Sequence, residues 1–130
     1  MWDEAQPAGM GLMEVEVEVM KVQGGPSRRL RLLIDTGASL SFIPQDVLGA
    51  LGIQPEDEEP FELGDGRIVE RKVGPAVIRY QGKSAGTQVV FAEPGDGLVL
   101  GVNALEELGL QLNPRSGRLE KAKRLFVVAR

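Results

Sequence analysis

The segment LRLLIDTGAS, residues 30–39, decides how this sequence is interpreted. Residues 30–34 become apolar on both faces as they approach Asp35, which is typical of a strand that runs into a buried sheet. The strand therefore delivers Asp35 from the predicted core. The tripeptide Asp-Thr-Gly recurs by chance in roughly 2% of chains of this length, and a polar turn explains it equally well when it is taken alone. Its meaning depends on the residues around it.

A second strand is predicted before this segment. Glu and Val alternate over residues 14–19, and a period of two buries one face of a strand while the other face contacts water. The Gly-Gly-Pro-Ser sequence of residues 24–27 is the expected turn between the two strands.

A short helix and a hairpin are predicted after the motif. Pro44 suits the first turn of a helix that runs to about Leu51, and Gly52 can adopt the left-handed conformation that ends it. Residues 61–63 and 67–69 flank a Gly-Asp-Gly sequence, which indicates a hairpin because tight turns of this kind need positive φ. Further strands separated by Gly or Pro turns are expected at residues 76–80, 87–91 and 98–100.

Another helix is predicted near the C-terminus. Asn103 followed by Glu106 resembles an N-cap with its reciprocal partner. Gly109 is placed to end the helix formed by residues 104–108.

The residues after this helix predict a hairpin and a last strand. Residues 114–117 contain the Pro and Gly that tight turns favour, so Leu119 is expected to pair with the strand over residues 110–112. The apolar residues 125–128 predict one more strand.

The length of the chain fits one hydrophobic core, because two separately stable cores would be small in 130 residues. We predict a single domain over residues 1–130, with a core of about residues 13–120. Residues 1–12 are expected to be a flexible N-terminus, and residues 121–130 to hold a C-terminal strand. Strands dominate the pattern, which indicates an all-β fold.

Composition argues against several classes of function. The chain has no Cys and no His, which excludes disulfides, thiol chemistry, the usual zinc ligands and serine–histidine catalysis. We expect neither a metal nor another cofactor. A net charge of −4 argues against nucleic acid, which needs a basic surface. No apolar run approaches the roughly 20 residues of a membrane-spanning helix and no secretion signal is evident, so a cytoplasmic location without a membrane partner is expected.

Two further features give the motif a context. Ala38 and Ser39 follow it directly, and later in the chain Leu98-Val99-Leu100-Gly101 precedes the predicted helix. This order of motifs, over about residues 15–114, resembles the retropepsin family, the single-domain aspartic peptidases of retroviruses and their bacterial relatives. The resemblance implies a closed, β-barrel-like acid-protease fold with one or two short helices, which acts as a homodimer on a peptide or protein substrate.

The resemblance implies that two carboxylates hydrolyse the peptide bond. Hydrolysis without a metal or a nucleophile needs one group to activate water and another to protonate the carbonyl oxygen. Two carboxylates held close together share one proton, so one acts as the base and the other as the acid. Because the sequence has one Asp-Thr-Gly, the second carboxylate must be Asp35 of another copy across a two-fold axis. Asp35 is therefore the expected catalytic residue of an aspartic endopeptidase.

Supporting roles around Asp35 also follow from the resemblance. Thr36 is expected to hydrogen-bond across the axis, Gly37 to let backbone approach the carboxylates and the substrate, and Ala38 to keep the floor of the cleft open. Gly101 is expected to pack beneath the loop as structural support. A core strand that ends in glycine explains Gly101 equally well when it is taken alone.

The predicted hairpin falls where the family has its flap. Gly64, Asp65 and Gly66 would then close over a bound peptide, exclude water and pair with the extended substrate backbone. Without the resemblance, an ordinary surface hairpin is the simpler interpretation.

This sequence departs from the viral pattern in two places. Many viral members have an acidic residue after the Ala that pairs with an Arg after the later Gly, whereas this chain has Ser39 and Val102 there. Contacts of that acid with the substrate backbone are therefore not carried over. The tail beyond Pro114 is also longer than in the viral enzymes. We hypothesise that residues 125–128 contribute to dimerisation, with packing on their own domain as the alternative.

Two other functions stay open on the sequence. A catalytically silent or latent relative would hold a peptide in the cleft of the dimer without cleaving it, and its motif would be the same. A structural β domain used as an assembly scaffold, with Asp35 bonded to nearby backbone in a turn, is the third interpretation.

Overall fold

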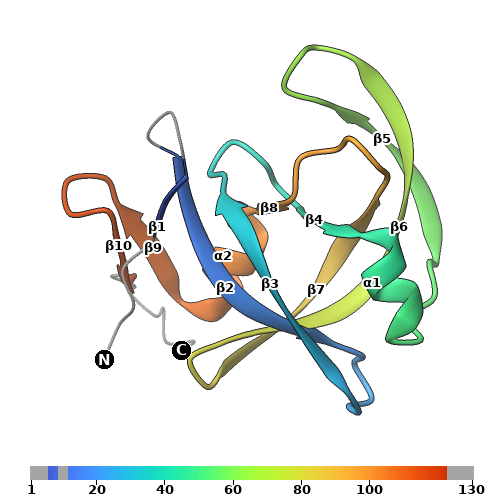
Figure 1. Cartoon of the computed structure of the whole chain (residues 1–130), viewed down its shortest axis with the longest axis horizontal. Coiled ribbons are helices and arrows are strands. Elements are labelled where there is room, and N and C mark those ends of the chain that lie inside the picture. Colours follow the sequence, from blue (N-terminus) through green and yellow to red (C-terminus); the bar gives the residue numbers. More distant parts are fainter. Residues whose placement is uncertain (1–5, 9–11, 123–130) are drawn as a thin grey trace, which may run out of the picture.

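Figure 1 shows the computed structural model of the chain, which describes residues 6–8 and 12–122. In chain order the elements are β1 (Gln6–Ala8), β2 (Leu12–Met20), β3 (Ser27–Ile34), β4 (Ser41–Pro44), α1 (Gln45–Ala50), β5 (Asp57–Glu62), β6 (Ile68–Tyr80), β7 (Lys83–Ala92), β8 (Val99–Leu100), α2 (Val102–Leu108), β9 (Leu110–Asn113) and β10 (Arg118–Lys121). The described residues are therefore mostly β.

The main sheet closes on itself. Among the described residues its strand order is β1-β2-β3-β8-β4-β7-β6-β5, and β2 also pairs with β6, with Val19 opposite Ile78. This additional pairing turns the sheet into a ring. The prediction of a mostly β fold with a closed sheet and short helices is thus confirmed for this part of the chain.

Apolar side chains from alternate strand positions fill the ring. Val15, Val17 and Val19 of β2 are buried while Glu16 between them is exposed, as the period of two predicts. These valines belong to one core cluster with buried residues of the other strands and of both helices. Each such side chain removed from water stabilises the fold by about 1.5–3 kcal/mol.

Two parallel strand pairs determine where the Asp-Thr-Gly motif lies. β3 runs parallel to β8, with Ile34 opposite Leu100, and β4 runs parallel to β7. Because parallel strands end at the same edge of a sheet, the residues that follow Ile34 and Leu100 emerge side by side. The sequence analysis missed β4, since Phe42 and Ile43 are both buried and show no alternation. Pro44 ends this strand, and α1 begins one residue later.

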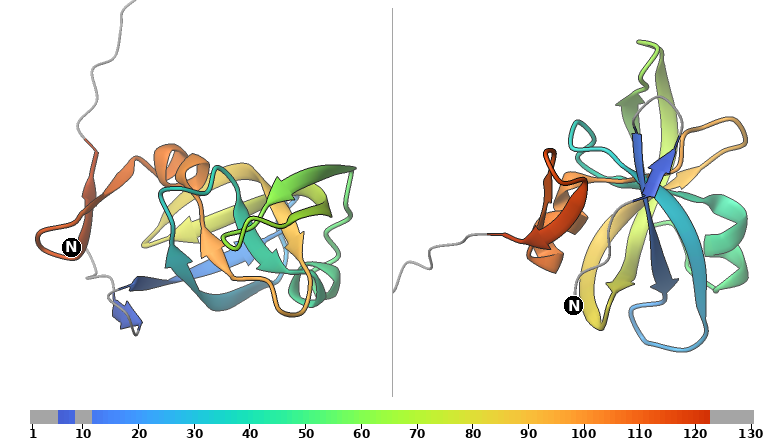
Figure 2. Two further views of the ribbon diagram at one scale, coloured as in Figure 1. Left: turned by 90° about the horizontal axis from the view of Figure 1, so that it is seen from above. Right: turned by 60° about the vertical axis from the view of Figure 1, so that its left-hand side comes forward.

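The hairpin of residues 57–73 consists of β5 and the first part of β6, and we call it the flap hairpin after the role that the resemblance predicts for it. Glu62 lies opposite Ile68, and Gly66 has a φ of 87°, which confirms the predicted tight turn. β6 then continues without a break to Tyr80, although the sequence analysis placed two shorter strands there. Figures 1 and 2 show the hairpin extending outward from the ring of the sheet.

The expected N-cap of α2 is wrong. The capping residue is Gly101, and no side chain of α2 makes a capping hydrogen bond. Instead, the backbone N–H groups of Val102 and Asn103 donate to the carbonyls of Ala38 and Ser39 at 2.8 and 3.1 Å. The loop that carries the motif therefore satisfies the free N–H groups at the start of this helix.

The region after α2 forms the predicted hairpin. Gly109 has a φ of 74° and ends the helix, and Leu119 of β10 lies opposite Leu112 of β9. The strand predicted at residues 125–128 lies outside the described residues.

Part of the segment assigned to a flexible N-terminus, residues 6–8, forms β1 and pairs with β2. In the described part of the chain, no helix is both long enough and apolar enough to cross a membrane.

Candidate active site

The Asp-Thr-Gly loop is fixed by hydrogen bonds on both sides of Asp35. The N–H of Asp35 donates to the Leu100 carbonyl at 3.0 Å, and the N–H of Ala38 donates to the Asp35 carbonyl at 3.2 Å. The N–H of Gly37 donates to Oδ1 of the Asp35 carboxylate at 2.9 Å. The backbone therefore orients this carboxylate, although Asp35 itself is exposed in the single chain.

Gly101 lies directly beneath the loop. A Cβ atom at this position would lie 2.6 Å from the carbonyl carbon and oxygen of Leu40 and 2.9 Å from the carbonyl oxygen of Ala38. These are backbone atoms, which cannot move aside as the end of a flexible side chain does. Only glycine allows β8 to approach the loop this closely.

Ser41 is a supporting residue that the sequence analysis missed. Its side chain is buried, and its Oγ accepts a hydrogen bond from the N–H of Gly101 at 2.9 Å. A buried N–H without a partner is unfavourable, so this bond stabilises the contact between β4 and the start of α2. The available signal in the sequence was a serine directly before the apolar residues 42–44.

The predicted catalytic and flap residues meet at one cleft. Asp35, Ala38, Phe42 and Val99 line a cavity of about 310 Å³. Its lining also includes the hairpin residues Glu62, Leu63, Gly64, Asp65 and Arg67 and the loop residues Gly95, Asp96 and Gly97. The structure thus brings the Asp-Thr-Gly loop and the tip of the flap hairpin together. Gly66, also predicted in the flap, forms the turn beside them.

Asp65 is engaged within the flap hairpin. Its Oδ1 accepts the N–H of Arg67 at 3.0 Å, and its Oδ2 contacts Nε of Arg67 at 2.7 Å. These two bonds, the backbone bond first, lower the pKa of Asp65 below its ordinary value of 3.8. Asp65 thus stays ionised and shapes the turn.

A second ion pair joins the flap hairpin to the loop between β7 and β8, which also lines the cleft. Arg71 of β6 contacts the Asp96 carboxylate through Nε at 2.8 Å and through Nη2 at 2.9 Å. The side chain of Asp96 is 3% exposed and that of Arg71 is 12% exposed. The hydrogen bond from Arg71 is the main cause that lowers the pKa of Asp96 below its ordinary value of 3.8.

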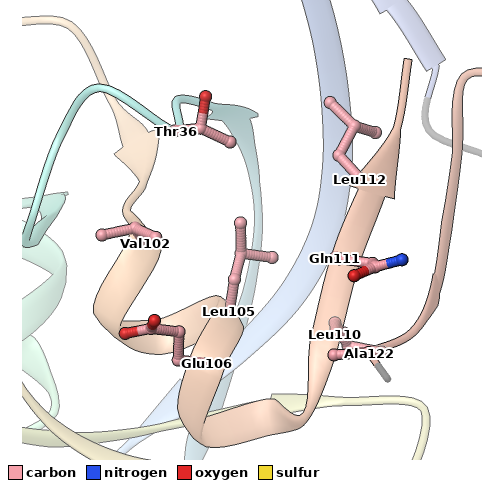
Figure 3. Close-up of a pocket in the computed structure, with 8 residues that line it drawn as sticks. All are labelled: Thr36, Val102, Leu105, Glu106, Leu110, Gln111, Leu112 and Ala122. Carbon is pink, nitrogen blue, oxygen red and sulfur yellow. The ribbon is translucent and has the colours of Figure 1, made fainter. Parts of the chain in front are cut away.

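Thr36 is absent from the lining of this cleft and borders a second cavity. Figure 3 shows Thr36 above a cavity of about 540 Å³ between α2 and β9, with Val102, Leu105 and Leu112 on its walls. Glu106, Leu110, Gln111 and Ala122 complete the lining. The lining next to Thr36 is therefore largely apolar.

The chemistry open to this site is set by its carboxylates. Asp65 and Asp96 are each bonded to an arginine, whereas the Asp35 carboxylate accepts its hydrogen bond from the backbone of its own loop. One carboxylate can act as a base or as an acid, but peptide hydrolysis needs both in one step. Among the described residues, Asp35 is the carboxylate of this cleft that is oriented by backbone without an arginine partner.

The sequence matches one family model, described as gag-polyprotein putative aspartyl protease, over residues 19–107. The matched segment contains Asp35, the flap hairpin, Asp96 and Gly101. No curated protein matches the chain.

Proposed function

We propose that this chain, which belongs to the gag-polyprotein aspartyl protease family, is an aspartic endopeptidase that works as a homodimer. The observation that supports this most strongly is Asp35, whose carboxylate is oriented by the Gly37 N–H at the same cleft that the flap hairpin lines. Peptide bonds are hydrolysed between two Asp35 carboxylates, one from each subunit.

The two carboxylates share one proton. At a short separation both cannot easily be ionised, so the ionised Asp35 takes a proton from water while the protonated Asp35 donates to the carbonyl oxygen of the peptide. The attacking water and the scissile carbonyl lie between the two groups.

The residues around Asp35 keep the two carboxylates in place. Gly37 holds one carboxylate oxygen through its N–H, and a Cβ on it would lie 3.2 Å from Asp35 Oδ1. Gly101 lets β8 support the loop from below, and Ala38 leaves room on the floor of the cleft. Thr36 lies next to Asp35 and is exposed in the single chain, which suits a hydrogen bond across the two-fold axis.

The flap hairpin covers the substrate. Gly64, Asp65 and Gly66 form its tip, and Gly64 and Asp65 line the cleft together with Asp35. An extended peptide bound there gains backbone hydrogen bonds to the hairpin, and closure removes bulk water from the carboxylates. Phe42, Leu63 and Val99 make the neighbouring surface apolar, which favours apolar substrate side chains.

The experiment that tests this function is cleavage of a denatured protein mixture between about pH 3 and pH 8, as a general acid–base profile requires. Wild-type protein and the Asp35→Asn variant are compared, and sedimentation gives the oligomeric state of both. We expect the wild type to cut, the variant not to cut, and both to be dimers.

The other outcomes separate the alternatives. If both proteins are dimers and neither cuts, while both bind an unfolded peptide, the chain is a latent or peptide-binding relative. If the wild type is a monomer at all concentrations, the shared site cannot form.

A further inference from the structure

The ion pair between Arg71 and Asp96 has the geometry of a fixed connection. Nε and Nη2 of the guanidinium contact the two carboxylate oxygens at 2.8 and 2.9 Å, which is the parallel two-bond arrangement that arginine makes with a carboxylate. With 12% and 3% of the side chains exposed, the pair is largely shielded from water. An ion pair of this kind is worth more than an exposed one.

The two residues connect two segments that both line the cleft. Arg71 belongs to the flap hairpin, where it lies opposite Glu59 on β5. Asp96 belongs to the wall loop, defined here as residues 93–98, which joins β7 to β8 and whose residues Gly95, Asp96 and Gly97 line the cleft together with Asp35. The pair therefore links a segment expected to close over a peptide with a segment that borders the catalytic carboxylate.

The wall loop is itself built around Asp96. Oδ2 of Asp96 accepts the N–H of Glu93 at 2.9 Å, and the N–H of Asp96 donates to the Glu93 carbonyl at 3.0 Å. Glycines flank Asp96 on both sides, and Gly95 has a φ of 94°, so the neighbouring backbone has little stiffness of its own. The carboxylate of Asp96 thus holds both its own loop and the flap hairpin.

A further contact joins the same two segments. Nη1 of Arg71 donates to the Glu70 carbonyl at 2.9 Å and lies 3.5 Å from the Glu93 carboxylate. One guanidinium therefore contacts the hairpin backbone and both acidic residues of the wall loop. Lysine, with a single ammonium group, cannot make this set of contacts.

We propose that Arg71 and Asp96 are positioning residues that hold the flap hairpin and the wall loop as one unit, so that the cleft is shaped before the peptide binds. This inference rests on the proposed peptidase function. Peptide binding then costs less ordering of the two walls, and the pair contributes to affinity without touching the reacting atoms. The Arg71–Asp96 pair favours the bound ground state and the transition state equally, so its loss raises KM and leaves kcat nearly unchanged.

Kinetics of Arg71→Lys and Asp96→Asn on one cleaved peptide test the proposal. We expect KM to rise about tenfold in each variant, equivalent to about 1.4 kcal/mol, with kcat within about twofold of the wild type. The double variant is expected to match the single variants, because either change alone already removes the connection. Arg79→Lys, on the same strand β6 but beside Ser84 at the far end, is the matched control and should leave KM and kcat unchanged.

Hydrogen exchange provides a readout that does not depend on activity. In Arg71→Lys, amide exchange is expected to become faster in both the flap hairpin and the wall loop, while the amides of β2 and β3 keep their protection. If no peptide is cleaved by the wild type, the proposed function fails, and this exchange pattern alone decides whether the connection exists.

Three results would overturn the proposal. KM could be unchanged in both single variants, the effects of the two changes could add in the double variant, or exchange could rise in one wall only. Arg71→Lys keeps the charge and the length of the side chain, so it remains informative if Asp96→Asn fails to fold.

Discussion

Glycine at position 101 is the residue on which the loop geometry depends most directly. Its missing Cβ leaves room for the carbonyl groups of Leu40 and Ala38, and its N–H is bound by the buried Oγ of Ser41. Both contacts link β8 to the segment that follows Asp35. The position of the Asp35 carboxylate is therefore coupled to the packing of a residue far from it in sequence.

Replacing Gly101 by alanine is expected to disturb this coupling. The added Cβ would lie 2.6 Å from backbone atoms, and such overpacking lowers the free energy of unfolding by about 1–3 kcal/mol. Urea unfolding at one fixed protein concentration measures the change, and peptidase activity should fall with it. Gly86→Ala is the control, because a Cβ there meets nothing within 4 Å. An equal loss in both variants would refute the role assigned to Gly101.

Asp96 gives stability a defined dependence on pH. The hydrogen bond from Arg71 lowers the pKa of Asp96 in the folded state. Between this lowered pKa and the ordinary value of 3.8, the unfolded chain binds protons more readily than the folded chain, so the free energy of unfolding rises with pH. The contribution of ionised Asp96 to the free energy of unfolding is fully present above the ordinary pKa of 3.8. It is lost as the pH falls through the lowered pKa of the folded state.

Asp96→Asn is accordingly expected to lower the free energy of unfolding at pH 7 by about 1–3 kcal/mol. The difference from the wild type should shrink as the pH falls below 3.8. Urea titrations at pH 7 and at about pH 3 measure it. Asp65→Asn, in the exposed pair at the tip of the flap hairpin, is the comparison and should change stability little at either pH. A constant difference for Asp96→Asn at both values would contradict this account.

Among the elements, the flap hairpin has the clearest separate role. Its tight turn requires Gly66 at a φ of 87°, and its tip lies at the cleft with Asp35. The turn between β6 and β7 requires a similar conformation of Gly82, with a φ of 80°. The two turns place the same demand on the backbone but differ in their distance from the site.

We expect Gly66→Ala and Gly82→Ala to cost similar stability, about 1–2 kcal/mol each, because both force a side chain into the left-handed region. Only Gly66→Ala should also lower kcat/KM, since its turn lies at the cleft with Asp35. Thermal unfolding and peptide kinetics of the two variants measure the separate effects. Equal losses of kcat/KM would mean that the hairpin acts through stability alone.

The elements also show where prediction from sequence succeeds and fails. Strands with one wet face, such as β2, were predicted because burial alternates along them. β4 was missed because its residues Phe42 and Ile43 are buried together and the following Pro44 resembles the start of a helix. The N-cap of α2 was misplaced because backbone carbonyls of the motif loop cap this helix, and sequence patterns register side-chain caps only.

In the candidate site too, some residues could be predicted from the sequence and others could not. Asp35 and the flap turn could be predicted because each is a local pattern. Ser41 looks like an ordinary polar residue, and its burial depends on the pairing of β4 with two other strands. Arg71 and Asp96 are 25 residues apart and resemble solvated charges until the fold places them together.

At the scale of the whole molecule, the central claim is that one catalytic site needs two chains. The structure gives each chain one oriented Asp35 at an open cleft, and the two-carboxylate reaction needs a second from another copy. A largely apolar cavity lies on the other side of the loop, next to Thr36. Under the proposed mechanism, this arrangement is half of a catalytic site.

The measurement that tests this claim most directly is the activity of mixed dimers of wild-type and Asp35→Asn subunits at constant total protein concentration. Sedimentation first establishes that both proteins dimerise, and the two proteins are then mixed in denaturant and refolded together so that mixed dimers form. If each site needs Asp35 from both chains, activity varies with the square of the wild-type fraction and falls to about a quarter in an equal mixture. Activity of about half in that mixture, in proportion to the wild-type fraction, would show that each chain acts alone and would contradict the account.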